Sequence, residues 1–180
     1  MSLAKVYKNV YIVGGKIVDE NDTNAYLIYN EINDYYLLID TTTGINIRYV
    51  IEGLLEIMRG QNKLKYIILT SCKIENSGGL SYIYNIFKPI TVAHFPDSIM
   101  IRKGECQNTS YSPSPISLEI KDKKYNLDIF SIFLSKTITN GNILIKYKDI
   151  IFSGSNTKIS PYYKNAKYIC DINNCRSISD

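Results

Sequence analysis

The feature that most constrains the fold is a segment in which a buried strand, a polar loop and a helix follow one another. The apolar run at residues 66–69 breaks into the polar stretch TSCKIEN, and Ser77-Gly78-Gly79 then begins a helical pattern. A short apolar run bounded by loops is typical of a buried strand. The segment therefore predicts a mixed α/β fold with a loop shaped like an active-site loop at the end of a strand.

The first half of the chain alternates strands with helices. An antiparallel start with a hairpin turn at 31–34 is followed by an amphipathic helix that ends at Gly60. The expected strands are 6–13, 25–29, 35–39, 64–69 and 89–93, and the expected helices are 45–59 and 79–87.

The second half is expected to be mostly β. A short helical turn at 98–102 and a polar loop up to Pro115 precede strands at 116–120, 127–134, 143–147 and 150–152. The 180 residues suit one domain, 1–180, and no internal repeat is evident. This order predicts two packed sheets flanked by helices.

Composition narrows the class of protein. The net charge of +4 comes from 21 basic and 17 acidic residues spread along the chain, so nucleic-acid binding is not expected. No apolar run approaches the ~20 residues of a membrane helix, and residues 1–9 lack a signal-peptide pattern, so we expect a cytoplasmic protein. The abundance of Ile, Tyr and Lys is compatible with a thermophilic source or with nucleotide bias.

The four cysteines show no CxxC pair and are too few for a disulfide scaffold. We therefore expect mostly free thiols. Cys170 and Cys175 lie close enough in sequence to form a bridge if the tail turns back.

Several segments, in order, resemble the metallo-β-lactamase fold superfamily of hydrolases. They are NVYIV, NAYLI, YYLLIDTTTG, KYIILT and SGGL, and the resemblance covers roughly residues 9 to 155. It implies an α/β fold of the four-layer αββα sandwich type, shortened at the C-terminus.

The same resemblance identifies the positions at which the family holds its metals. In the family, the strand ending Leu-Thr is followed by His-x-His-x-Asp-His, a small residue and Gly-Gly. Those ligand positions correspond here to Ser71, Lys73, Glu75 and Asn76. This chain therefore lacks the family's ligands in the first loop.

Two later family motifs have also changed. Ile138 replaces the histidine of a Gly-His-Thr-Pro-Gly turn, although a shifted alignment would place Lys136 there. Ser155 replaces the aspartate of Phe-Ser-Gly-Asp that bridges two metals in the family. The sole histidine, His94, belongs to a different strand and is interpreted as structural.

A zinc site needs three or four His, Cys or carboxylate ligands that converge on one point. This chain has one histidine, and Lys73 beside Cys72 and Glu75 would repel a cation. We expect no metal and no other cofactor. Without a metal to lower the pKa of water, the family's hydrolytic mechanism has no nucleophile.

Other uses of the loop remain open. Ser71 with Lys73, or Cys72, could serve as a metal-independent nucleophile. Lys73 and Glu75 could form an ion pair that fills the space of the metals. A small anion could bind near Ser77 to Gly79 at the helix start.

We interpret the chain as a metal-free, catalytically silent binding or scaffold module with no catalytic residues. Its vestigial site comprises Ser71, Lys73, Glu75, Asn76, Ile138 and Ser155. A protein partner or a homodimer is expected, and the 16 tyrosines could supply an interface or simply pack the sheets. The alternatives are a hydrolase that uses Ser71, Cys72 or Lys73, and a sensor of small anions or nucleotides.

Overall fold

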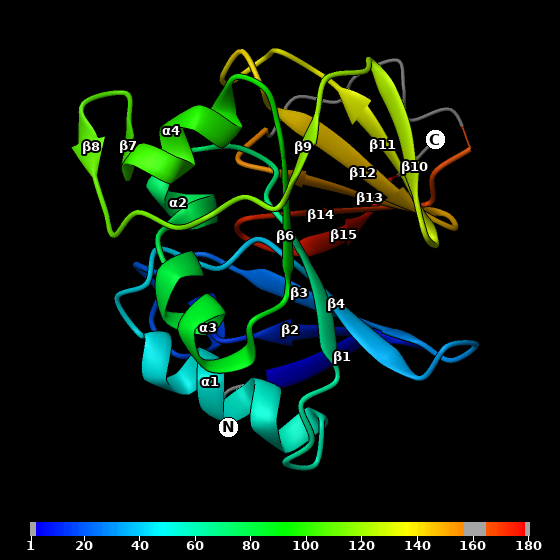
Figure 1. Ribbon diagram of the computed structural model, residues 1–180. Helices are drawn as coiled ribbons and strands as arrows, with labels where there is room; N and C mark the ends of the chain where they lie inside the picture. The colour runs from blue at the N-terminus through cyan, green and yellow to red at the C-terminus, as the bar shows by residue number, and fades with distance from the viewer. Residues whose placement is uncertain (1–2, 157–164, 179–180) are drawn as a thin grey trace.

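The computed structural model describes residues 3–156 and 165–178, and Figure 1 shows their arrangement as two sheets with helices over one of them. The first sheet runs from antiparallel to parallel: β1 to β4 alternate in direction, whereas β4, β5, β6 and β9 are parallel. Its strands in spatial order are β1 (Leu3–Tyr7), β2 (Val10–Val13), β3 (Ala25–Asn30), β4 (Tyr35–Ile39), β5 (Leu64–Ile68), β6 (Ile90–His94) and β9 (Leu118–Ile120).

The second sheet is antiparallel except for the parallel pair β13 and β14. Its strands in spatial order are β10 (Lys124–Leu127), β11 (Phe130–Leu134), β12 (Ile143–Tyr147), β13 (Ile150–Gly154), β14 (Tyr168–Asp171) and β15 (Cys175–Ser177). A separate small hairpin joins β7 (Glu105–Cys106) to β8 (Thr109–Ser110).

The described helices are η1 (Gly15–Ile17), α1 (Ile47–Ile57), α2 (Ile74–Ser77), α3 (Leu80–Phe87) and α4 (Asp97–Lys103). Helices α1 and α3 turn their apolar sides, which include Leu54 and Ile83, onto the outer face of the first sheet. Gly60 adopts a φ of +71° just after α1, a conformation that suits glycine and ends the helix.

Two large cores hold these layers together. The inner core lies between the sheets and contains Tyr26 and Phe152, whose rings are 5.3 Å apart. The outer core lies between the first sheet and the helices. A smaller apolar cluster, Leu144, Ile151 and Ile169, lies on the other face of the second sheet.

The described residues form a mixed α/β fold with a helical layer and two sheets. The connection from β13 to β14 includes residues 157–164, which lie outside the described residues.

The structure corrects several expected boundaries. The run 6–13 is two strands because the chain turns between Tyr7 and Val10, and 127–134 is divided by a turn at Asp128, whose φ is +55°. The polar loop before Pro115 contains the β7–β8 hairpin, which was not expected. Strands β14 and β15 were not expected either.

The expectation of mostly free thiols is wrong. Cys72 is bonded to Cys106, and Cys170 is bonded to Cys175 across the β14–β15 pair. The bridge between Cys170 and Cys175 is the one that the sequence allowed.

Among the described helices, none is long and apolar enough to span a membrane.

Candidate functional site

The candidate site lies where β4, β5 and β13 end. Asp40 follows β4, Thr70 and Ser71 follow β5, and Ser155 follows β13. The short helix α2 brings Asn76 to the same place, and Figure 1 shows α2 at the junction of the two sheets. Three of the six predicted vestigial residues therefore meet at the ends of these strands.

Asn76 is the centre of this cluster. Its Oδ1 accepts hydrogen bonds from the hydroxyls of Ser71 and Ser155, each at 2.7 Å. Its Nδ2 donates to Asp40 Oδ2 at 2.9 Å. One buried amide thus joins the loop after β5, the end of β13 and the end of β4.

Asp40 is the residue that the sequence reasoning missed. Its side chain is buried and accepts hydrogen bonds from the Thr70 amide at 2.8 Å and the Thr70 hydroxyl at 2.7 Å. Burial raises the pKa of Asp40 from 3.8 to about 7, although the hydrogen bonds from Thr70 and Asn76 act in the opposite direction. The sequence signal that could have identified Asp40 as a site residue is its position directly after the apolar run YYLLI.

The end of β13 can approach this cluster only because residue 154 is glycine. Gly154 has a φ of +56°, and a Cβ atom there would lie 2.0 Å from Thr70 Oγ1. A side chain would therefore force Ser155 away from Asn76.

Lys73 and Glu75 lie beside the cluster. Lys73 Nζ is 3.8 Å from Glu75 Oε1, and both side chains are about one-third exposed. This distance is long for a charge-assisted hydrogen bond, so the pair is a loose one. Glu75 Oε2 is buried and has no hydrogen-bond partner among the described residues.

Ile138 is separate from the Asn76 cluster. Together with Lys136, Cys72 and Cys106, it lines a cavity of about 320 Å³ next to the loop. The buried Asp97 fixes one wall, because it accepts hydrogen bonds from the amides of Cys72 at 2.8 Å and Gly141 at 2.9 Å.

His94 is also remote from the cluster. It is buried at the end of β6, where its ring nitrogens contact the carbonyl oxygens of Phe95 and Asp122. Both contacts are to the backbone, which agrees with a structural side chain.

The donor set does not fit zinc. No group of three or more His, Cys, Asp or Glu side chains in the described part of the chain could hold a metal ion. At the family's ligand positions, Ser71 and Ser155 offer hydroxyls, and their bonds to Asn76 occupy its amide oxygen. Such neutral groups are poor zinc ligands compared with imidazole, thiolate or carboxylate.

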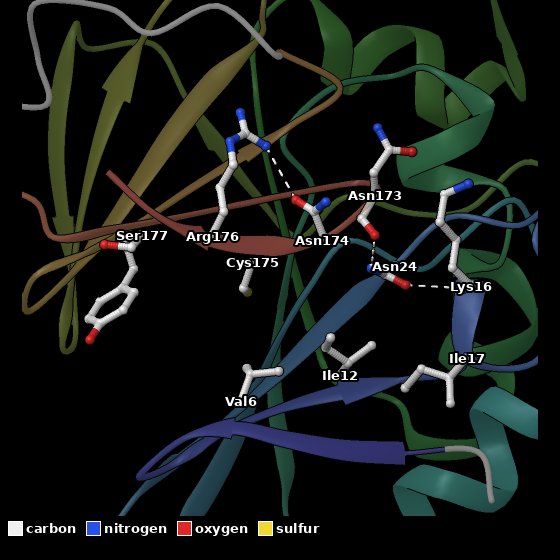
Figure 2. A pocket seen from close by; sticks show the side chains of 11 residues that line it. Val6, Ile12, Lys16, Ile17, Asn24, Asn173, Asn174, Cys175, Arg176 and Ser177 are labelled. Atoms are coloured by element: carbon white, nitrogen blue, oxygen red, sulfur yellow. Dashed lines mark hydrogen bonds between the residues drawn. The ribbon is translucent and has the colours of Figure 1, made fainter. Parts of the chain in front are cut away.

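A second hollow lies away from this site, between the edges of the two sheets. Figure 2 shows Val6, Ile12 and Ile17 turned toward it from β1, β2 and η1, opposite Cys175 of β15. Its volume is about 470 Å³. Asn24 joins its walls by donating from Nδ2 to the Asn173 carbonyl at 2.9 Å.

Comparison with known proteins identifies the fold. No protein-family profile and no curated protein sequence matches the chain. Solved structures do match it. A metallo-β-lactamase from Cronobacter sakazakii with a HARLDQ motif has a TM-score of 0.71 and 14% identity over 92% of this chain and 67% of its own.

Two further structures give the same result. The metallo-β-lactamase MIM-1 from Novosphingobium pentaromativorans has a TM-score of 0.74 and 12% identity, over 94% of this chain and 75% of its own. VMB-1 has a TM-score of 0.72 and 17% identity, over 97% of this chain and 90% of its own.

The chain therefore has the metallo-β-lactamase fold. It is shorter than these proteins, spanning between 67% and 90% of their lengths. Identities this low show the fold alone, so the chemistry must be argued from the residues of this chain.

Proposed function

We propose that this chain is a metal-independent binding or scaffold module that keeps the metallo-β-lactamase fold without its hydrolytic centre. The observation that carries the proposal is the bonding of Ser71 and Ser155 to a single acceptor, Asn76 Oδ1. In this arrangement an amide connects the two loops that a metal would connect in the family.

The alternative of a metal-independent hydrolase has lost one of its nucleophiles. Cys72 is part of a disulfide and has no thiol to ionise. Ser71 is buried, and its hydroxyl donates to Asn76, while the Lys73 ammonium lies near Glu75. A serine activated by lysine needs the hydroxyl and the amine in contact.

The alternative of an anion sensor at this loop gains little support. Lys73, the cation on which it depended, has the Glu75 carboxylate 3.8 Å away, and this negative charge would oppose the binding of an anion. The backbone amides of Ser77 to Gly79, just before α3, already donate to the carbonyl oxygens of Lys73, Ile74 and Thr42.

Zinc loading tests the proposal. After incubation with excess zinc and removal of free metal, we expect the protein to contain well below one zinc ion per chain by plasma mass spectrometry. About one or two ions per chain would refute the proposal.

A hydrolysis assay tests the alternative, with nitrocefin and simple esters as probes. If the wild-type protein turns over a probe and Ser71→Ala abolishes that turnover, the protein is a hydrolase instead.

The matched control restores ligands at the same positions. In the variant Ser71→His, Lys73→His, Glu75→Asp, Asn76→His, the loop carries the family's pattern again. Zinc uptake by this variant, without uptake by the wild type, would show that the assay detects a competent site.

A protein partner or self-association remains part of the proposal. Sedimentation velocity over a range of concentrations distinguishes a homodimer from a monomer that needs a different partner.

A further inference from the structure

A third hollow, which we call the tyrosine hollow, lies at the C-terminal end of α1. Its volume is about 600 Å³, and its floor contains Tyr11 of β2, Tyr29 of β3 and Tyr36 of β4. Figure 1 shows the β3–β4 hairpin reaching beyond the helices, which leaves this end of the first sheet without a helix over it.

The three rings share one face of the sheet. Tyr29 and Tyr36 are direct partners across β3 and β4, with ring centroids 4.8 Å apart. Tyr11 is paired with Leu27, two residues from Tyr29, so it lies diagonally beside that ring on the same face. The sheet therefore presents a row of half-buried aromatic rings.

The rim of the hollow is polar and carries balanced charge. Asp34 accepts a hydrogen bond from the Tyr29 hydroxyl at 2.8 Å and pairs with Lys63 at 2.6 Å. Glu56 and Arg59 add one further charge of each sign. The hollow thus has no net charge to select an anion or a cation.

Three long side chains at the rim have unused hydrogen-bonding capacity. Glu56, Arg59 and Gln61 are exposed, and their side chains make no hydrogen bond or ion pair with any other described residue. Together they offer carboxylate acceptors, guanidinium donors and an amide that does both.

We propose that the tyrosine hollow binds a neutral oligosaccharide. The C–H face of a pyranose ring carries partial positive charge, which is attracted to the negative face of an aromatic ring. Its hydroxyls both donate and accept, as the three free rim side chains do. The volume lies within the range of about 300–1,000 Å³ typical of small-molecule sites.

A nucleic acid would also stack on tyrosines, but its phosphates call for a net positive groove. Here each cation has a matching carboxylate. The hollow of Figure 2 has polar side chains at its rim, but Tyr168 is the one aromatic residue among those that line it, so it lacks a row of rings. The proposal does not depend on the absence of a metal centre.

The experiment uses cellotetraose, maltotetraose and tetra-N-acetylchitotetraose, which are all neutral, as separate probes in isothermal titration calorimetry and saturation-transfer NMR. We expect saturable binding of at least one of them. Glu56→Ala should weaken binding about tenfold, because it removes a carboxylate that can accept hydrogen bonds from sugar hydroxyls. The carboxylate is exposed, so its removal should have little effect on folding. Tyr29→Leu, which keeps an apolar side chain on the strand but removes the ring, should weaken it at least as much.

The control variant is Tyr82→Ala, which removes a tyrosine that is 48% exposed on α3, away from the hollow. It should bind like the wild type. If none of the tetrasaccharides binds, or if Glu56→Ala and Tyr29→Leu leave affinity unchanged, the proposal is wrong. If Tyr29→Leu does not fold, Glu56→Ala alone decides. Binding of a thymidine decamer without binding of any saccharide would also overturn it and indicate a nucleic-acid surface.

Discussion

The buried carboxyl of Asp40 makes the stability of this protein depend on pH in an unusual direction. Its pKa is about 7 in the folded protein, against 3.8 when unperturbed, because burial disfavours the charged form. Between these values the folded state keeps a proton that the unfolded state has lost. The free energy of unfolding therefore falls as pH rises through this window.

The magnitude follows from the size of the shift. A difference of about three pKa units corresponds to about 4 kcal/mol, lost progressively between about pH 4 and pH 7 and constant above that. Carboxyls whose pKa is lowered, such as Asp34, held down by hydrogen bonds from Lys63 and Tyr29, act in the opposite sense at lower pH.

The variant Asp40→Asn isolates this effect, because an amide carries no charge at any pH. The new side chain would turn its NH₂ group toward the donors Thr70 and Asn76, which costs stability by an amount that does not vary with pH. The stability of the variant relative to the wild type should therefore increase by up to about 4 kcal/mol from pH 4 to pH 7.

The measurement is urea unfolding followed by circular dichroism at several pH values across this range, with the disulfides intact. Other titrating groups are common to both proteins and cancel in the difference. A difference that stays constant with pH would refute the reasoning. It would mean that the hydrogen bonds from Thr70 and Asn76 outweigh burial and keep Asp40 ionised.

Two further predictions concern the framework around this site. Gly154→Ala should destabilise the fold by more than about 2 kcal/mol in urea unfolding, because φ is positive and the Cβ atom would meet Thr70. The control Gly60→Ala, where φ is also positive but the space is open, should cost about 1 kcal/mol. Equal losses of stability in the two variants would contradict this prediction. Replacing Cys72 and Cys106 together by serine opens a bridge between residues 34 apart in sequence and should lower the free energy of unfolding by about 4 kcal/mol; a loss below about 1 kcal/mol would count against a bridge that constrains the unfolded chain.

The order of strands and helices up to β13 was largely predictable, because each element has its own hydrophobic period. Helix α1 places Val50 and Leu54 on one face, and β5 leads into the apolar run at residues 66–69. Strands β14 and β15 escaped prediction since they are short and polar at their ends. Their position depends on the Cys170–Cys175 bridge and on Asn24, which is 149 residues from its partner Asn173.

The sequence did not predict how the residues of the candidate site contact one another. Resemblance aligned Ser71, Asn76 and Ser155 with ligand positions of the family, but only the fold shows that Ser71 and Ser155 both donate to Asn76 Oδ1. Asp40 is 36 residues from Asn76, so their bond depends on the pairing of β4 with β5 rather than on any local pattern.

The Asn76 cluster joins loops that lie far apart in the sequence through neutral hydrogen bonds. A zinc ion would join the loop after β5 to the end of β13 through charged bonds. Here Asn76 joins the same two places and also reaches Asp40, using a neutral side chain that needs no cation. The consequence is a carboxyl with no counter-charge bonded to it in a buried site, which is why its pKa lies near neutrality. The pH dependence of folding is therefore the measurement that reports the burial of this carboxyl in solution.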